Sequence, residues 1–380
     1  MHVHSVHPSF LQKFVANGVT GIRDMGGGAA DATDGCESVK IEVLLRWRDG
    51  IRSGDLVGPR MYLSGPAVSN TNWPGSINIK TPAEARDAVA RLKAIGADFI
   101  KVYEKIPLDA YLELARAAGS ADLHIAGHVP VDTVGLIQAS NAGHRSVEHI
   151  RDHLLMSFTK SRSELLKFFR DDKWEGPDVA WGMDNFKACP AAIKTFRRNQ
   201  TWLVPTLVVE RAKVAVNDPE FVESRQRQLM PEAVRRGFVD YVAKKRAQSH
   251  AERASEQLWW EKQLLLVGRM RGEQVGILAG TDSSCEGGIP GISLHEELKL
   301  MVAAGLSPLE ALQTATINPA KYLRQESEFG TLRNGRAADI VLLNANPLER
   351  IDRTSDIYAV VADGRYFSRS QLDRLMVSGH

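Results

Sequence analysis

Short apolar segments rich in β-branched residues alternate with amphipathic segments of helical period along most of the chain. Strands are predicted at residues 1–4, 19–24, 60–65, 98–103, 124–128, 145–150, 201–209 and 276–282. Helices are predicted at residues 9–16, 82–95, 107–118, 131–142, 239–253, 258–267, 293–304 and 307–323. Strands that alternate with helices are typical of βαβ units around a parallel sheet. Eight strands with right-handed crossovers favour an α/β fold of the closed (β/α)8 TIM barrel type over an open sheet.

Two local signals support this assignment. Asn17-Gly18 follows the first predicted helix, as expected for a helix end. Thr81-Pro82-Ala83-Glu84 carries an N-cap threonine, a proline at the first helical position and a glutamate at the third. This pattern predicts a capping box at the start of the helix over 82–95.

The pattern also predicts how the chain is divided. Residues 1–328 are expected to form the barrel, with helical insertions at about 155–200 and 210–270. Residues 330–344 and 356–366 are rich in Ile, Val and Leu and are separated by Pro347. We therefore expect residues 329–380 to form a small, incomplete β domain, the remnant of a β-sandwich, and a C-terminal tail.

Composition narrows the function classes. The 380 residues carry 48 Lys and Arg against 46 Asp and Glu, which gives a net charge of +2 and no reason to expect nucleic acid or an anionic membrane as a partner. Three cysteines exclude a disulfide scaffold and a Cys-rich zinc module. No apolar run has the length of a membrane span, about 18 residues, and no signal peptide is recognised. The chain as given is expected to be cytoplasmic, whereas the compartment of a longer precursor stays open.

Histidines near the start provide the first candidate chemistry. His2 and His4 lie two residues apart on a predicted strand, and this period places both imidazoles on one face, where they can hold one metal ion. The alternative is an ordinary pair of terminal histidines. Further ligand types at the carboxyl ends of later strands favour the metal, because barrel active sites are built there.

Lys101 lies within the apolar strand predicted at 98–103, where an ammonium group is costly to bury. In one interpretation its flexible side chain carries the charge to the surface. In the other, burial favours the neutral amine, which combines with carbon dioxide to form a carbamate whose two oxygens could bridge two metal ions.

Three further candidates end apolar strands. His128 and His149 follow the strands predicted at 124–128 and 145–150, and Asp282 follows the last strand. Each histidine could be a hydrogen-bonded structural residue, and Asp282 could cap the following turn. Alternatively, all three bind metal, and Asp282 also accepts a proton. Glu148 is expected on the opposite strand face from His149 and is not counted as a ligand.

Taken together, these candidates resemble the amidohydrolase superfamily, in particular its imidazolonepropionase-like and Xaa-dipeptidase-like members. The C-terminal half carries phrases similar to that family at residues 280–283, 294–298, 304–312, 316–320 and 330–341. The resemblance covers most of residues 1–366 and is weakest across residues 155–200 and 210–270.

The resemblance implies a barrel hydrolase in which one or two divalent ions, usually zinc, serve the cleavage of an amide or related C–N bond by metal-activated hydroxide. The residues that would hold the metals are His2, His4, Lys101 as a carbamate, His128, His149 and Asp282. Asp282 would also transfer the proton, and Tyr103 would donate a hydrogen bond to the developing oxyanion. Manganese, cobalt or iron could replace zinc with these ligand types.

The chain departs from that family at its beginning, because His2 follows the first residue directly. We expect a truncated reading frame that lacks the N-terminal β segment. The strands around 340–343 and 359–361 would then expose an apolar edge prone to association.

Competing functions remain open at this stage. The same site could hydrolyse an ester, a lactone or a phosphotriester, or a truncated chain could bind metal without turnover. The expected partner is a small-molecule amide or dipeptide substrate, and a homo-oligomer is compatible with the sequence.

Overall fold

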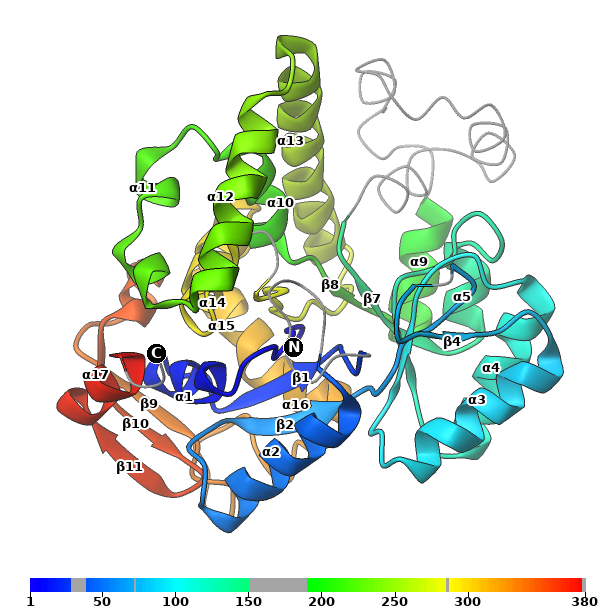
Figure 1. Ribbon diagram of the computed structural model, residues 1–380, viewed down its shortest axis with the longest axis horizontal. Helices are drawn as coiled ribbons and strands as arrows, with labels where there is room; N and C mark the ends of the chain where they lie inside the picture. Colours follow the sequence, from blue (N-terminus) through cyan, green and yellow to red (C-terminus); the bar gives the residue numbers. More distant parts are fainter. Residues whose placement is uncertain (29–38, 72, 151–189, 285–286, 378–380) are drawn as a thin grey trace.

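The computed structural model describes residues 1–28, 39–71, 73–150, 190–284 and 287–377 (Figure 1). In these residues the strands form three sheets. Two sheets are parallel, and the third, near the C-terminus, is antiparallel. The expected α/β class is therefore confirmed.

The larger parallel sheet has six strands in the order β4-β3-β5-β6-β7-β8. Its strands are β3 (Val68–Ser69), β4 (Ile77–Asn78), β5 (Ile100–Val102), β6 (Ile125–Gly127), β7 (His144–Glu148) and β8 (Trp202–Val204). The smaller parallel sheet pairs β1 (Gly21–Asp24) with β2 (Arg60–Leu63). On one side the two sheets are linked by a hydrogen bond of 2.8 Å from Asp98 N to the carbonyl of Leu63.

On the other side the parallel sheets meet through residues 1–4 and 277–283, a region that we call the seam. Val3 bridges Asp24 of β1 and Ser283, and Ile277 bridges Leu203 of β8. The seam residues make isolated bridges and a few further backbone hydrogen bonds, and the strands expected at 1–4 and 276–282 are not formed as regular strands.

Helices pack around the parallel sheets and the antiparallel sheet. The helices that precede β8 are α1 (Ser9–Ala16), α2 (Ile41–Ser53), α3 (Pro82–Ala94), α4 (Leu108–Ser120), α5 (Leu136–Asn141) and α9 (Pro190–Asn199). Those that follow β8 are α10 (Leu207–Val214), α11 (Pro219–Val222), α12 (Glu232–Arg246), α13 (His250–Gly272), α14 (Ile292–Ala303), α15 (Pro308–Ala315), α16 (Ile317–Leu323) and α17 (Arg369–Val377). Short 3-10 turns occupy Arg225–Leu229 and Ile351–Ser355. Figure 1 shows α12 and α13 rising together from the body of the molecule.

Several predicted elements are confirmed in position. The first helix spans Ser9–Ala16 as expected, and Thr81 and Glu84 form the capping box that starts α3. Of the insertion expected at about 155–200, residues 155–189 lie outside the described residues, and α9 forms the remainder. Helices α12 and α13 lie in the segment expected over 210–270, but the helix expected at 239–253 is wrong in its bounds, because α12 ends at Arg246 and α13 runs from His250 to Gly272.

The strand expected at 201–209 is wrong beyond Val204. Pro205 has no backbone N–H for the sheet, and Thr206 adopts a left-handed conformation with φ 50° and ψ 49°. The chain therefore turns there, and α10 begins at Leu207. The apolar run Leu207-Val208-Val209 belongs to a helix, which the periodicity of so short a run cannot distinguish from a strand.

The C-terminal sheet has the order β11-β10-β9, formed by β9 (Ile340–Leu343), β10 (Ile357–Ala362) and β11 (Arg365–Ser368). Asp363-Gly364, both with positive φ, make the tight turn between β10 and β11. The apolar edge expected at 359–361 is wrong, because β10 is the central strand and Val360 is fully buried. The edge expected at 340–343 is present, since β9 lies at the margin of the sheet and exposes 42% of Leu342.

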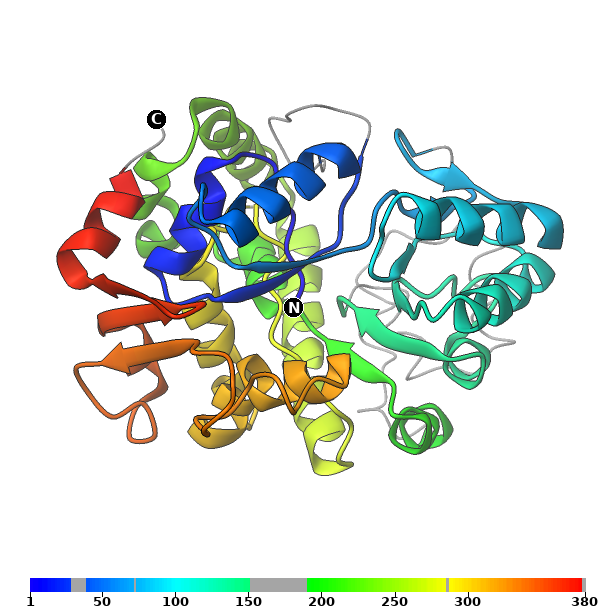
Figure 2. The same cartoon turned by 90° about the horizontal axis from the view of Figure 1, so that it is seen from below.

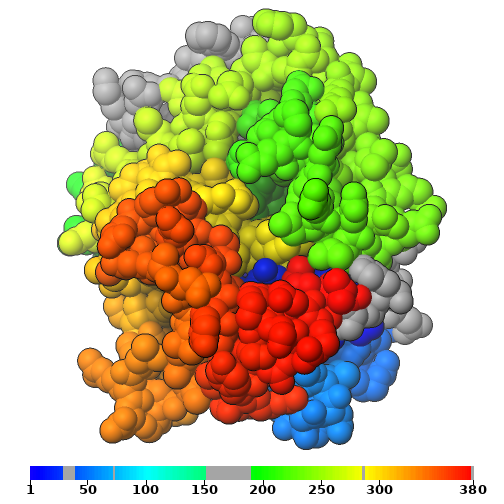
Figure 3. Space-filling view, turned by 90° about the vertical axis from the view of Figure 1, so that its left-hand side faces the viewer, coloured from blue at the N-terminus to red at the C-terminus, as the bar shows by residue number. Residues whose placement is uncertain are grey.

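Apolar side chains bind these parts together. The largest buried cluster lies between the six-stranded sheet and helices that include α3, α4 and α13. A further cluster joins Val15 of α1 to Val360, Phe367 and Leu372 of the C-terminal segment. Figure 2 shows α17 beside α1, and Figure 3 shows how the C-terminal segment, in red and orange, covers that side of the molecule. None of the described helices combines the length and apolar character that crossing a lipid bilayer requires.

Candidate metal centre

His2, His4 and Asp282 meet at the seam. Val3 is buried in the apolar cluster behind the seam, so His2 and His4 share the opposite face. Nε2 of His2 lies 3.1 Å, and Nε2 of His4 lies 3.2 Å, from Oδ1 of Asp282. Within the described residues, one donor atom from each of the three lies within 4.8 Å of the others.

The protonation of His2 indicates what this group can hold. Nδ1 of His2 lies 2.8 Å from Oε2 of Glu148. Because an ionised carboxylate only accepts hydrogen bonds, Nδ1 carries a proton, and Nε2 is the nitrogen that faces Asp282. Nε2 of His2 is buried and makes no hydrogen bond, although it lies next to a carboxylate oxygen.

A buried imidazole nitrogen and a carboxylate oxygen at this distance need a cation between them, either a proton on the nitrogen or a metal ion. Tetrahedral ligands of zinc, at 2.0–2.2 Å from the ion, lie about 3.4 Å from each other. The separations of 3.1 and 3.2 Å are close to that value. The residues therefore fit a divalent metal ion.

Charge states in this group agree with metal binding. Burial lowers the pKa of His4 to about 4, so the imidazole is neutral near pH 7, as a metal ligand must be. Burial alone would raise the pKa of Asp282, but the neighbouring His149, His2 and His4 outweigh it and hold the pKa well below its usual range. Asp282 is therefore ionised.

Glu148 hydrogen-bonds to His2, and Arg23 hydrogen-bonds to Glu148. The sequence analysis did not identify either residue as part of the site. Arg23 of β1 is fully buried and donates to Oε1 of Glu148 at 2.6 Å and to the hydroxyl of Tyr322 at 2.7 Å. Strand alternation was expected to turn Glu148 away from the face of His149. However, His149 has a positive φ of 67°, so regular alternation ends there and both residues contact His2. Charged residues inside two buried strands were the signal that could have revealed them.

Four more predicted residues continue from His2 as a row of contacts. The ring of His149 lies 4.6 Å from that of His2 and 5.0 Å from that of His128, measured between centroids. Tyr103 stacks on His128 at 4.1 Å, and Nζ of Lys101 lies 5.5 Å from the Tyr103 centroid. Lys101 is 3% exposed. The structure thus brings all seven predicted site residues into one region.

The position of His128 in this row depends on a glycine. Gly127 is the last residue of β6 and precedes His128. Its φ is +126°, and a Cβ there would lie 2.2 Å from the carbonyl oxygen of Val102 on β5. Only glycine allows β5 and β6 to approach this closely while His128 points to the site.

The histidines not expected at the site lie elsewhere, where they are described. His144 is within 2.8 Å of the Tyr111 hydroxyl, and His124 stacks on Phe99 at 5.4 Å. His153 lies outside the described residues.

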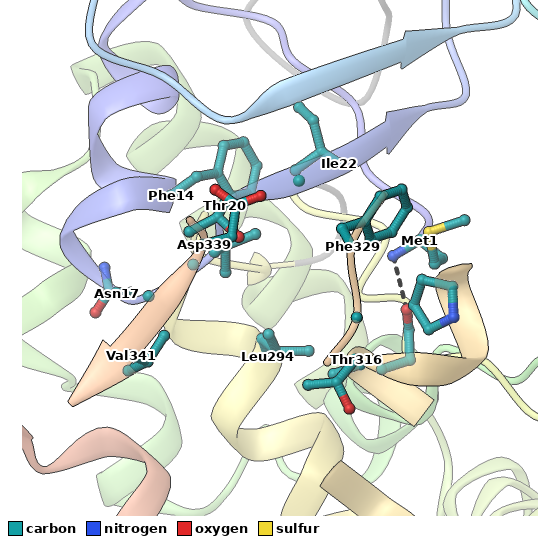
Figure 4. Close-up of a pocket in the computed structure, with 18 of the residues that line it drawn as sticks. Met1, Phe14, Asn17, Thr20, Ile22, Leu294, Thr316, Phe329, Asp339 and Val341 are labelled. Carbon is teal, nitrogen blue, oxygen red and sulfur yellow. Dashed lines mark hydrogen bonds between the residues drawn. The ribbon is translucent and has the colours of Figure 1, made fainter. Parts of the chain in front are cut away.

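A separate hollow of about 430 Å³ lies behind the seam, against the C-terminal sheet. Figure 4 shows Phe14, Ile22, Leu294 and Phe329 around it. None of the seven predicted site residues lines this hollow. It is therefore distinct from the metal centre.

Comparisons with known proteins agree on one family. The sequence profile described as "Amidohydrolase family" matches residues 3–367. Adenine deaminase 2 of Jannaschia sp. (strain CCS1) is 39% identical over 90 residues, which are 23% of this chain and 14% of that protein. Imidazolonepropionase of Herpetosiphon aurantiacus is 36% identical over 109 residues, which are 26% of this chain and 24% of that protein. The matched segments are thus short parts of both relatives.

A solved structure extends the likeness to the whole fold. A Xaa-Pro dipeptidase with bound methionine superposes with a TM-score of 0.64 over 97% of this chain and 85% of that chain, at 20% sequence identity. At this identity the likeness supports the fold alone.

Proposed function

The chain belongs to the amidohydrolase family, whose members hydrolyse carbon–nitrogen bonds, and from this premise we propose that it is a metal-dependent enzyme that cleaves the amide bond of a small substrate. The observation that carries the proposal is the convergence of His2, His4 and Asp282, with the buried Nε2 of His2 3.1 Å from Asp282 Oδ1. Such a pair is expected where a cation binds.

We assign the ligands in two sets. His2, His4 and Asp282 would hold one ion, and His128 and His149 the other, with Lys101 as a carbamate that bridges both. The burial of Lys101 supports this role, because a neutral amine is the form that combines with carbon dioxide. Zinc is the first candidate, and manganese, cobalt or iron are compatible with the same donors. When bound, the ions would acidify the attacking water and polarise the scissile carbonyl.

The chain's own groups would move the protons. Asp282, ionised at neutral pH, would accept a proton from the attacking water. It would then pass this proton to the nitrogen of the leaving amine, so that the C–N bond breaks without the release of an amide anion. Tyr103, which stacks on His128, would donate a hydrogen bond to the carbonyl oxygen as it gains negative charge.

A dipeptide is the substrate that we propose first, because a dipeptidase shares the fold over 97% of this chain. Trp73, 52% exposed, lies 5.9 Å from Tyr103 and gives the region an aromatic surface for a substrate side chain. We also propose that the two parallel sheets and the seam close into one (β/α)8 barrel, which would place these groups at its mouth.

Metal analysis of the purified protein tests the function. The wild-type protein should retain about two equivalents of divalent metal. Lys101→Ala should lose both metal and dipeptide hydrolysis, whereas Lys93→Ala, at an exposed position of α3, should change neither. A wild-type protein that binds no metal after incubation with Zn²⁺ or Mn²⁺ would contradict the proposal. If the protein contains the full amount of metal but hydrolyses esters and no amide, the proposed function would change to that of an esterase.

A further inference from the structure

Thr206 occupies the sharp turn between β8 and α10. It is fully buried and lies in the left-handed region, with φ 50° and ψ 49°. A β-branched residue rarely adopts this conformation. Strained backbone conformations of this kind persist where surrounding contacts enforce them, and they are frequent at functional sites.

The hydroxyl of Thr206 connects this turn to His149. Oγ1 donates to the carbonyl of Pro205 at 2.8 Å and lies 2.8 Å from Nδ1 of His149. The hydroxyl has a single proton, and the arrangement that satisfies both contacts is the one in which it donates to Pro205 and its oxygen accepts the Nδ1–H of His149. The imidazole then keeps its lone pair on Nε2. The backbone N–H of His149 also donates to Val204, so side chain and backbone are both held by the end of β8.

Thr206 does not form the hydrogen bond that a threonine before a helix usually forms. The residue before a helix commonly uses its side-chain oxygen to accept an N–H of the first turn. Thr206 makes no such bond. Instead, the two carboxyl oxygens of Glu297, which is fully buried on α14, accept hydrogen bonds from the N–H groups of Leu207 and Val208 at 3.0 and 2.9 Å.

The contact of Thr206 with His149 and the capping of α10 by Glu297 are connected. The first N–H groups of a helix need acceptors when they are buried. Glu297 supplies these acceptors from a different helix, so the hydroxyl of Thr206 is available to His149. Without Glu297, the hydroxyl would be drawn to the helix start.

We propose that Thr206 is a positioning residue that fixes the orientation and tautomer of His149, and that Glu297 enables it by capping α10 in its place. This rests on the proposed function in so far as His149 is a metal ligand. The hydrogen bond itself does not depend on the metal.

The first test needs no metal. In metal-free protein labelled with ¹⁵N-histidine, the His149 resonance, assigned by its loss in His149→Asn, should show the Nδ1–H tautomer. Thr206→Val removes the hydroxyl and should give a mixture of tautomers, whereas Thr206→Ser should keep the wild-type spectrum. Glu297→Gln should shift the same resonance without a change in Thr206 or His149. An unchanged His149 resonance in both Thr206→Val and Glu297→Gln would overturn the proposal.

The second test measures zinc binding by chelator competition. Thr206→Val should weaken one of two sites by about 10- to 100-fold, the usual effect of losing a group that orients a ligand, and Thr206→Ser should restore it. Thr314→Val, which removes another buried hydroxyl within α15, is the matched control and should bind zinc normally. Equal losses in all three variants would indicate a general packing defect and overturn the inference. If wild-type protein binds no zinc but shows the tautomer shift, the proposed function fails while the role of Thr206 stands.

Discussion

At the scale of single residues, two histidines of the site are held in the same manner by different partners. Nδ1 of His2 donates to the Glu148 carboxylate, and Nδ1 of His149 faces the Thr206 hydroxyl, both at 2.8 Å. Each contact leaves Nε2 as the nitrogen available to a metal. Groups that fix the tautomer of a ligand in this way contribute to metal affinity although they never touch the ion.

Glu148→Gln should expose this contribution. Both carboxylate oxygens accept hydrogen bonds, Oε1 from Arg23 and Oε2 from His2, but an amide has only one acceptor oxygen. The amide NH2 must therefore oppose either the guanidinium or the Nδ1–H. We expect metal affinity to fall about 10- to 100-fold and the free energy of unfolding to fall by about 3–5 kcal/mol, because a buried ion pair is broken.

Chelator competition and urea unfolding measure the two effects. Glu326→Gln, at an exposed position, should leave both unchanged. Wild-type metal affinity in Glu148→Gln would show that His2 needs no such partner.

At the scale of elements, the closeness of β5 and β6 determines where His128 lies. The pairing of Val102 with Gly127 leaves no room for a side chain on the latter. The site therefore depends on a strand contact as well as on its ligands.

Gly127→Ala should disrupt that contact. The added methyl group would lie 2.2 Å from a backbone oxygen that cannot move without its strand. We expect a loss of more than about 3 kcal/mol in unfolding free energy, above the usual range for a single substitution, together with reduced metal content. Gly119→Ala in α4 is the control, because a Cβ there meets nothing within 4 Å. It should be neutral or stabilising by up to about 1 kcal/mol. Equal stability of the two variants, measured by urea unfolding, would refute this explanation.

Sequence reasoning succeeded where local signals and tertiary structure agree. The capping box at Thr81 and the helix over Ser9–Ala16 depend on neighbours in the sequence, and both formed as expected. The roles of Glu148 and Thr206 depend on contacts with residues distant in the chain and on positive φ angles at His149 and Thr206. Strand alternation cannot anticipate such angles, because they are imposed by packing rather than by the local pattern.

At the scale of the whole molecule, buried neutral histidines are distributed far beyond the site. Burial lowers the pKa of His144 and of His295 to about 4, and of His124 to about 3. His144 lies at the start of β7, and His295 packs against Thr354 near the C-terminal segment. Neither position belongs to the metal centre.

These histidines predict a loss of stability in mild acid. An unfolded chain takes up protons on histidine near pH 6.5, whereas the folded protein does so only near pH 4 or below. The stabilising contribution is therefore complete above about pH 6.5 and is lost as the pH falls towards 4. Urea unfolding of metal-free protein between pH 7 and 4 should show this decline, and His144→Gln should flatten it relative to wild type. A His144→Gln profile parallel to that of wild type would contradict the assignment.

The seam has a consequence for the integrity of the molecule. His2 and His4 lie on one side of the seam and Asp282 on the other, and the two sides are joined by isolated bridges and by a few backbone hydrogen bonds, such as that from Asp282 N to the carbonyl of His2. Bringing together points so distant along a chain costs conformational entropy that grows with the length between them. A metal ion bound by residues from both sides would link them and stabilise the folded state, and this stabilisation would increase with the free metal concentration. Removing the metal with a chelator would then destabilise the fold as well as abolish activity. The stability of this protein would therefore depend on the supply of its metal.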